Sequence, residues 1–357
     1  MLHIVIVFGL LLIRDKIECK VCNDCMELTR CPGALAILTE DADTDTKQEF
    51  QNQFCGVKYV FGDRIPQVCC SDFARPPNEN LMQHRNFFLL PNSCGVINVT
   101  PNSSPRAKLY EFPWLALIAT EYYLGEKFVC DGVIISSLYI LTTAACAETS
   151  LSFVRVGDYN PDTAIDCMPD NVDVCEDHTQ NIYISEIIKH PKYVGSIRDI
   201  RNNLALLRLR EPIDFSFRNV APICLPIQAN QIYNSLNETG TIVGWLHNGI
   251  YELRDYGQLQ KFQQVIKPQT WCKTLLSRFK MNVTSMENSF CVFTHPNGIC
   301  NTIAGDPFMI IRKYNLVNRY ILQGIYSHGT KECIGNAPEV FVDVTKMVGW
   351  ILDTIQP

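Results

Sequence analysis

Short runs of apolar residues, separated by turn residues, fill the chain from about residue 105 onward. Many of these residues are β-branched or aromatic, and the runs lie at 114–120, 132–136, 204–209, 240–245, 308–313, 320–327 and 340–344. They predict short β-strands, because branched and aromatic side chains pack well on a pleated surface. No helical pattern lies between them, which predicts an all-β domain built as an antiparallel barrel or sandwich.

The end of the chain has a different period. Apolar residues recur there every three or four positions, at Val344, Met347, Val348, Ile351, Leu352 and Ile355. This spacing places them on one face of an α-helix. Packing of that face against a core accounts for the whole stripe, so we predict a terminal amphipathic helix.

The first thirteen residues, MLHIVIVFGLLLI, form another apolar run, and Arg14 follows it. The run is shorter than the ~20 residues that span a bilayer, which disfavours a membrane anchor. A cleaved secretory signal covering about residues 1–18 is the better interpretation. No later run is long and apolar enough to cross a membrane. We therefore expect a secreted, extracellular protein.

Seventeen cysteines support an oxidising compartment. Seven of them crowd a segment, 19–70, that has too few apolar residues for a core, namely Cys19, Cys22, Cys25, Cys31, Cys55, Cys69 and Cys70. Disulfides are expected to stabilise that segment instead. Metal binding by Cys19, Cys22 and Cys25 is the competing interpretation, and a secreted location disfavours it.

Residues 71–104 form a linker by composition, with Pro76-Pro77 and several asparagines. Four sequons would accept glycans in a secreted protein, at Asn98, Asn102, Asn237 and Asn282. The net charge of −6 argues against a nucleic-acid partner, because such proteins usually carry a basic patch.

One motif near the C-terminus indicates a chemistry. The sequence CNTIAGDP, from Cys300 to Pro307, resembles the nucleophile loop CxGDSGGP of the chymotrypsin-like serine proteases. Ala304 stands where that family has its serine. A methyl group cannot attack a carbonyl carbon, so acyl transfer through a covalent intermediate is unavailable at this position.

Two further segments carry the same resemblance. LTTAAC, ending at Cys146, is similar to LTAAHC and puts Ala145 at the general base. NNLALL, beginning at Asn202, is similar to NDIALL and puts Asn203 at the orienting aspartate. The resemblance therefore implies a degenerate triad of Ala145, Asn203 and Ala304, and no catalytic residue.

The resemblance also implies the architecture. Residues 105–357 would form a double six-stranded β-barrel closed by a C-terminal helix, and residues 19–70 resemble the clip domain of arthropod secreted proteases. The implied disulfides are Cys94–Cys224, Cys130–Cys146, Cys167–Cys175, Cys272–Cys291 and Cys300–Cys333. The clip bridges would use Cys25, Cys31, Cys55, Cys69 and Cys70 together with Cys19 or Cys22.

Three positions are implied for the primary specificity pocket. Gly298 lies at its base, His328 lines the cleft, and Glu339 replaces a glycine on the wall, where its side chain would partly fill the pocket. An outward-facing Glu339 is the alternative. Asp306, in place of the second loop glycine, further changes the cleft.

Activation by proteolysis is not expected. The stretch aligned with the family's cleavage site is TPNSS, residues 100–104, and Ile303 replaces the aspartate that pairs with the new amine. An ammonium buried against isoleucine would be uncompensated, at a cost of several kcal/mol.

Some relatives bind calcium on an acidic loop, which makes Asp158 and Asp166 candidate ligands, although an acidic solvated loop is the simpler interpretation. No other cofactor is expected.

The resemblance implies a non-catalytic serine protease homologue that acts as a cofactor or regulator in arthropod innate immunity, through melanisation (prophenoloxidase) or Toll-type signalling. Its partners in haemolymph would be cascade proteases or prophenoloxidase-like zymogens. Two alternatives stay open. One is an active trypsin-like serine endopeptidase, and the other is a module that recognises microbial surfaces.

Overall fold

The computed structural model describes most of the chain, in two units that are considered separately, Met1–Glu79 and Asn80–Pro357. The described residues are 25–28, 54–60, 63–69, 81–101, 104–122, 125–148, 150–168, 171–196, 198–228, 231–232, 238–245, 257, 259–279, 281, 283, 285–293, 302–314, 317–329 and 337–357. Several predictions lie outside them: the signal at 1–18, Cys19, Cys22, Cys31, Cys70, Asn102, Asn237, Asn282, Gly298 and the Cys300–Cys333 bridge. Within the described part, no helix is long and apolar enough to cross a bilayer.

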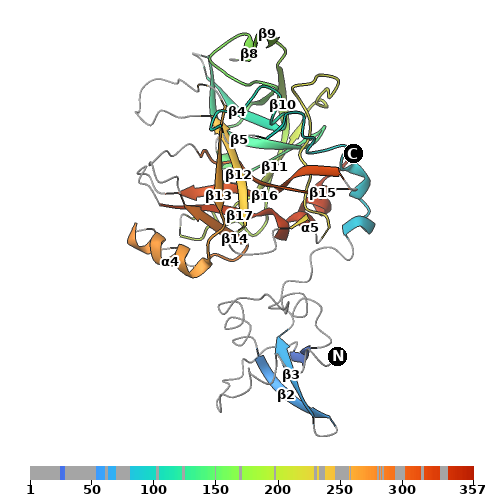
Figure 1. Cartoon of the computed structure of the whole chain (residues 1–357), viewed down its shortest axis with the longest axis vertical. Coiled ribbons are helices and arrows are strands. Elements are labelled where there is room, and N and C mark those ends of the chain that lie inside the picture. The colour runs from blue at the N-terminus through green and yellow to red at the C-terminus, as the bar shows by residue number, and fades with distance from the viewer. Residues whose placement is uncertain are drawn as a thin grey trace. The chain divides into compact units, whose positions relative to one another are not determined.

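The first unit contains a three-stranded antiparallel sheet (Figure 1). Its strands are β1 (Cys25–Glu27), β2 (Phe54–Val60) and β3 (Asp63–Cys69), with β3 in the centre. A Cys25–Cys55 disulfide crosslinks β1 to β2, and Cys69 is also disulfide-bonded. Among the described residues of this sheet, the buried apolar side chains are Leu28, Phe54, Val68 and Cys69. Small sheets with few buried apolar groups gain little hydrophobic stabilisation, and the Cys25–Cys55 bridge supplies a covalent crosslink here.

The second unit begins with a closed six-stranded barrel. Its hydrogen-bonded order is β10-β11-β6-β5-β4-β7. The strands are β4 (Leu115–Tyr122), β5 (Gly125–Ser136), β6 (Tyr139–Thr142), β7 (Phe153–Val156), β10 (Gln180–Lys189) and β11 (Ala205–Leu209). A two-stranded hairpin of β8 (Asp166–Met168) and β9 (Asn171–Glu176) lies between β7 and β10 in the chain, and its Cys167–Cys175 disulfide joins opposite residues.

A second six-stranded antiparallel sheet follows, in the order β13-β12-β15-β16-β17-β14. Its strands are β12 (Thr239–Trp245), β13 (Leu259–Val265), β14 (Ser289–Phe293), β15 (Pro307–Tyr314), β16 (Val317–Gly329) and β17 (Pro338–Asp343). The expected second closed barrel is a half-barrel in the described residues. Its edge strands approach each other at one isolated bridge, where the Lys267 N–H donates to Cys291 O at 2.9 Å.

Two α-helices complete the described part of this unit. The predicted terminal helix is α5 (Val348–Thr354), preceded by one 3₁₀ turn at Val344–Lys346. The other helix, α4 (Gln269–Arg278), has no counterpart in the sequence prediction. Only Cys272 and Leu276 of α4 are buried, so its apolar stripe is too narrow for hydrophobic periodicity to reveal. The Cys272–Cys291 disulfide fastens it to β14.

Part of the segment expected to be a linker packs on this unit. The Asn86 amide donates to the carbonyls of Leu352 and Ile355 at 2.8 and 3.0 Å, and so binds carbonyls at the C-terminal end of α5. The Cys94–Cys224 disulfide then ties the segment to the loop that follows the first barrel. Residues 81–101 are therefore part of the second unit.

Candidate functional site

Ala145 follows β6 and Asn203 precedes β11, and the two residues contact each other. The Ala145 N–H donates to Asn203 Oδ1 at 2.8 Å, and Asn203 Nδ2 donates to Ser327 Oγ at 2.8 Å. Asn203 is completely buried, with its oxygen and its nitrogen both bonded. Its amide thus holds the loop before Cys146 against β16, but it carries no charge to stabilise an imidazolium.

Ser327 and His328 extend this network. Ser327 Oγ lies 2.5 Å from His328 Nδ1. Because the serine oxygen accepts from Asn203, its own proton is free to bond the imidazole nitrogen. Burial lowers the pKa of His328, so the ring is neutral at pH 7. The sequence placed His328 in the cleft but did not reveal that Ser327 bridges it to Asn203.

Ala304 lies in a tight turn that contacts both sheets of the second unit. Its carbonyl accepts the Asp131 N–H at 2.9 Å and lies 3.5 Å from Cys146 Sγ, in the Cys130–Cys146 disulfide. The Gly305 N–H donates to Tyr326 O at 3.1 Å. Gly305 has φ +110°, and a Cβ there would lie 1.6 Å from Asp131 O, so this position requires glycine. The structure thereby brings Ala304 beside the segment that carries Ala145.

Two buried aspartates meet next to this turn. Asp131 on β5 and Asp306 before β15 are 1 % and 0 % exposed. Asp306 Oδ2 accepts the Ile303 N–H at 2.7 Å. Burial raises the pKa of Asp131 to about 7, and burial together with the charge of Asp131 raises the pKa of Asp306 well above its usual value. Sequence reasoning noted Asp306 but missed Asp131, because the two are far apart in the chain.

Glu339 on β17 faces inward. It is 5 % exposed and accepts a hydrogen bond from Thr302 Oγ1 at 2.7 Å. Burial raises its pKa to about 7, only partly offset by this bond. The side chain therefore occupies buried space beside the 302–306 turn, as the inward-facing interpretation requires, and does not extend into solvent.

The segment after the aligned cleavage site is anchored to β13. Ala107 N donates to Leu259 O at 3.0 Å, and Lys261 N donates to Pro105 O at 2.7 Å. The Lys261 ammonium forms a buried ion pair with Glu111, which also accepts the Lys108 N–H at 2.8 Å. This segment is therefore held by backbone bonds and by a buried charge pair.

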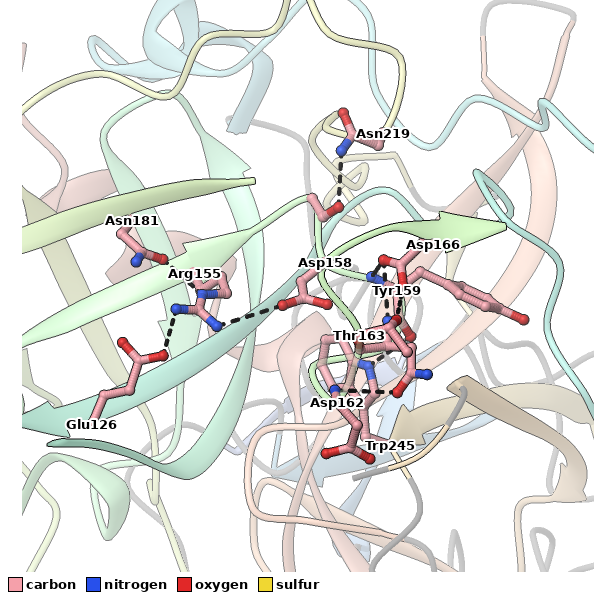
Figure 2. Close-up of polar contacts among 12 residues, drawn as sticks. Glu126, Arg155, Asp158, Tyr159, Asp162, Thr163, Asp166, Asn181, Asn219 and Trp245 are labelled. Atoms are coloured by element: carbon pink, nitrogen blue, oxygen red, sulfur yellow. Dashed lines mark hydrogen bonds and ion pairs between the residues drawn. The ribbon is translucent and has the colours of Figure 1, made fainter. Parts of the chain in front are cut away.

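The two calcium candidates point to different partners (Figure 2). Asp166 accepts from the Tyr159 and Asn160 N–H groups at 2.9 and 3.3 Å and from Thr163 Oγ1 at 2.8 Å, which engages both of its oxygens. Asp158 turns toward Arg155, 3.7 Å away. Its second oxygen has no hydrogen-bond partner in the described residues.

Asp166 therefore braces its own loop, and the pair does not fit a shared calcium site. Across the described part of the chain, no group of three His, Cys, Asp or Glu side chains is arranged to hold a metal ion. Burial, reinforced by the nearby charge of Asp166, raises the pKa of Asp158 to about 7 against the opposing effect of Arg155.

Comparisons with known proteins concern the family and the fold of the chain. A family model described as Trypsin matches residues 102–351. "CLIP domain-containing serine protease HP8" of Bombyx mori is 25% identical over 97% of this chain and 96% of its own length. "Venom serine protease Bi-VSP" of Bombus ignitus is 30% identical over 82% and 79%, and "Phenoloxidase-activating factor 3" of Holotrichia diomphalia is 30% identical over 70% of each.

The fold is also similar to a solved structure, described as "Crystal structure of drosophila Grass clip serine protease of Toll pathway". The match covers 92% of this chain and 93% of that one, with a TM-score of 0.61. The sequence identity is 24%, so this likeness concerns the fold alone.

Proposed function

Because the chain belongs to the trypsin family and to the clip-domain serine proteases within it, we propose that it is a non-catalytic regulator of an extracellular proteolytic cascade. One observation supports this most strongly. Ala145, Asn203 and Ala304, which the sequence resemblance aligns with the triad, lie in one neighbourhood that is held together by the Asn203–Ser327 bond and the Asp131–Ala304 bond. That neighbourhood offers neither a nucleophile at 304 nor a base at 145.

The size of the chemical loss favours a non-catalytic role. In subtilisin, whose serine, histidine and aspartate act as a unit, removing the triad lowers kcat by about 10⁶, or roughly 8 kcal/mol of transition-state stabilisation. All three positions differ from the triad here. Turnover from substrate binding alone would be too slow for peptide bonds.

The Ser327–His328 contact supports the competing hypothesis, an active endopeptidase with a relocated nucleophile. A serine and a histidine at 2.5 Å satisfy the first geometric condition for such a pair. However, Ser327 is only 7 % exposed, and its hydroxyl already bonds Asn203. A substrate carbonyl therefore has little access to its oxygen.

Labelling of the secreted full-length chain with a fluorophosphonate probe decides between the two. We expect no covalent adduct by intact-mass measurement, both for the native chain and for Ser327→Ala. An active clip-domain protease in the same assay serves as the positive control. Stoichiometric labelling of the native chain that disappears in Ser327→Ala would establish the relocated site, and labelling that persists would place a nucleophile elsewhere.

The names of the relatives support the cascade role. Among them are "Phenoloxidase-activating factor 1" of Holotrichia diomphalia and "Melanization protease 1" of Drosophila melanogaster. We propose that this chain binds cascade proteases or prophenoloxidase-like zymogens in haemolymph. The disulfide bonds of both units fit a secreted protein, because such bonds persist in oxidising compartments.

Adding the purified chain to haemolymph depleted of it tests this role. We expect the rate of phenoloxidase activation after a microbial challenge to change with the amount added, and the chain to co-purify with a protease or a zymogen. Ala304→Gly is a matched control, because it alters the degenerate position without adding chemistry and should behave like the native chain. An unchanged activation rate at all doses would exclude the proposal.

A further inference from the structure

The Asp131–Asp306 contact joins the two sheets of the second unit and plays no part in the proposed function. Asp131 lies on β5 of the closed barrel, and Asp306 immediately precedes β15 of the other sheet. Both side chains are at most 1 % exposed. Neither carboxyl has access to solvent that could hydrate a negative charge.

The surroundings of the two acids offer little compensation. Asp306 Oδ1 and Asp131 Oδ2 have no hydrogen-bond partner in the described residues. The backbone supplies the Ile303 N–H to Asp306 Oδ2. Two adjacent carboxylates buried in this way could not both be ionised without a large penalty.

The groups that face the pair come from several strands. β12 presents Gly244, where a Cβ would lie 2.4 Å from Asp306 Oδ2, and β17 presents Glu339, whose charge also disfavours ionisation of Asp306. β6 presents Thr142, whose hydroxyl bonds the Asp131 carbonyl at 2.7 Å. Within the described residues, no Lys, Arg or His is among the charges that act on either carboxyl.

We propose that Asp131 and Asp306 share a proton and form a latch between the two sheets, which holds the 302–306 turn in place and loosens as the pH rises. One proton is shared between the two carboxyls, and the Ile303 N–H orients the Asp306 carboxyl. When that proton leaves to solvent, two like charges face each other beside Ala304. Thr302 lies on the same turn, and its hydroxyl bonds Glu339 on β17. The cleft around Ala304 therefore changes when the latch loosens.

The direction of the pH effect follows from linkage. A carboxyl that is protonated in the folded chain but ionised in the unfolded chain stabilises folding at low pH. This contribution is complete below the unfolded pKa, falls as the pH rises above it, and is lost once the pH passes the raised folded value of about 7. The latch does not depend on whether this chain cleaves peptides.

The test uses the full chain and the variants Asp131→Asn and Asp306→Asn, with exposed Glu211→Gln as the control. For the native chain and Glu211→Gln, we expect the unfolding equilibrium constant to rise by about a hundredfold more between pH 5 and pH 8 than in either Asn variant. In Asp131→Asn, an amide N–H replaces the shared proton and needs no titration. Parallel pH profiles for all four proteins would overturn the proposal.

Infrared spectroscopy supplies a second readout that does not require the Asp131 and Asp306 variants to fold. Glu339 and Asp158 also have raised pKa values, so the diagnostic signal is the C=O intensity of buried protonated carboxyls that persists at pH 5 in Glu339→Gln and in Asp158→Asn, and this intensity should disappear toward pH 9. Absence of this intensity at pH 5 would exclude the latch.

Amide hydrogen exchange follows the loosening itself. Exchange at Asp131 and Gly305, which bond Ala304 O and Tyr326 O, should accelerate over the same pH range beyond the intrinsic pH effect. The Ile134 amide, which bonds Trp114 O within the first barrel, is the internal control. Equal acceleration at all three amides would contradict a latch that acts on the 302–306 turn.

Discussion

Asp166 and Asp306 brace two loops of the same unit in similar ways, yet their surroundings differ. Each is at most 6 % exposed, and Asp166 accepts two backbone N–H groups from its own loop while Asp306 accepts one. Asp166 fills its remaining oxygen with the Thr163 hydroxyl, whereas Asp306 leaves Oδ1 without a donor in the described residues and faces a second carboxyl. The two aspartates are therefore alike in burial. They differ in the number and the kind of groups that contact their carboxyl oxygens.

The largest effect on stability is expected when a buried acid that has a charged partner, Glu111, loses that partner and so resembles Asp306. Lys261→Met removes the ammonium that pairs with buried Glu111 and leaves it the Lys108 N–H as a donor. We expect it to lower the free energy of unfolding by about 4 kcal/mol at pH 7, because an unpaired buried charge is costly.

Chemical denaturation of Lys261→Met at pH 7 measures this change, and exposed Lys127→Met is the control. A loss below about 1 kcal/mol would mean that Glu111 finds another partner or reaches water.

A smaller effect is expected when the fully bonded acid is removed. Asp166→Ala deletes three hydrogen bonds to the 159–163 turn and leaves buried N–H groups without that acceptor. At roughly 1 kcal/mol for each bond, we expect a loss of about 3 kcal/mol.

Thermal unfolding at pH 7 checks this value against Asp162→Ala, a variant of an exposed residue on the same turn whose carboxylate bonds the Gly257 N–H. Equal losses in the two variants would contradict the bracing role of Asp166.

Glu339 offers a milder version of the Asp306 situation, because it has one hydroxyl donor and no second carboxyl bonded to it. Its pKa is raised to about 7, so the native chain should lose stability as the pH rises above the unfolded value of 4.5. Between pH 5 and pH 7 this loss is about 2 kcal/mol, and Glu339→Gln should abolish it.

Urea titrations of Glu339→Gln and of exposed Glu211→Gln at several pH values give the difference directly. If both variants keep the native pH slope, Glu339 is ionised in the folded chain.

The smallest effect is expected at the partly exposed charge beside Asp158. Arg155→Gln breaks its bond to Glu126 Oε1 at 2.5 Å and the longer contact with Asp158. Partly exposed pairs contribute little, so we expect less than about 1 kcal/mol at pH 7. The pKa of Asp158 should rise further, since the charge of Arg155 lowers it.

Carbon NMR of the Asp158 carboxyl follows that titration, and Glu126→Gln, which breaks only the exposed half of the contact, is the control. An unchanged Asp158 titration in Arg155→Gln would rule out this coupling.

Much of the fold could be predicted from local patterns. The apolar runs at 114–120 and 320–327 are β4 and β16, and the stripe from Val344 to Ile355 forms a 3₁₀ turn and α5. The pairs Cys130–Cys146 and Cys272–Cys291, which the family resemblance implied, are disulfides in the structure. Helix α4 escaped prediction because only two of its residues are buried.

The sequence by itself determined which residues stand at 145, 203 and 304, and the side chains of Ala145 and Ala304 can act neither as base nor as nucleophile. Only the tertiary structure decided which polar groups form hydrogen bonds with one another around those positions. Nothing in the sequence links Asp131 to Asp306, and they become a coupled pair because β5 and the turn before β15 meet at a buried seam. Whether a carboxyl ionises depends on its solvent access and on its neighbours, and the fold alone supplies both.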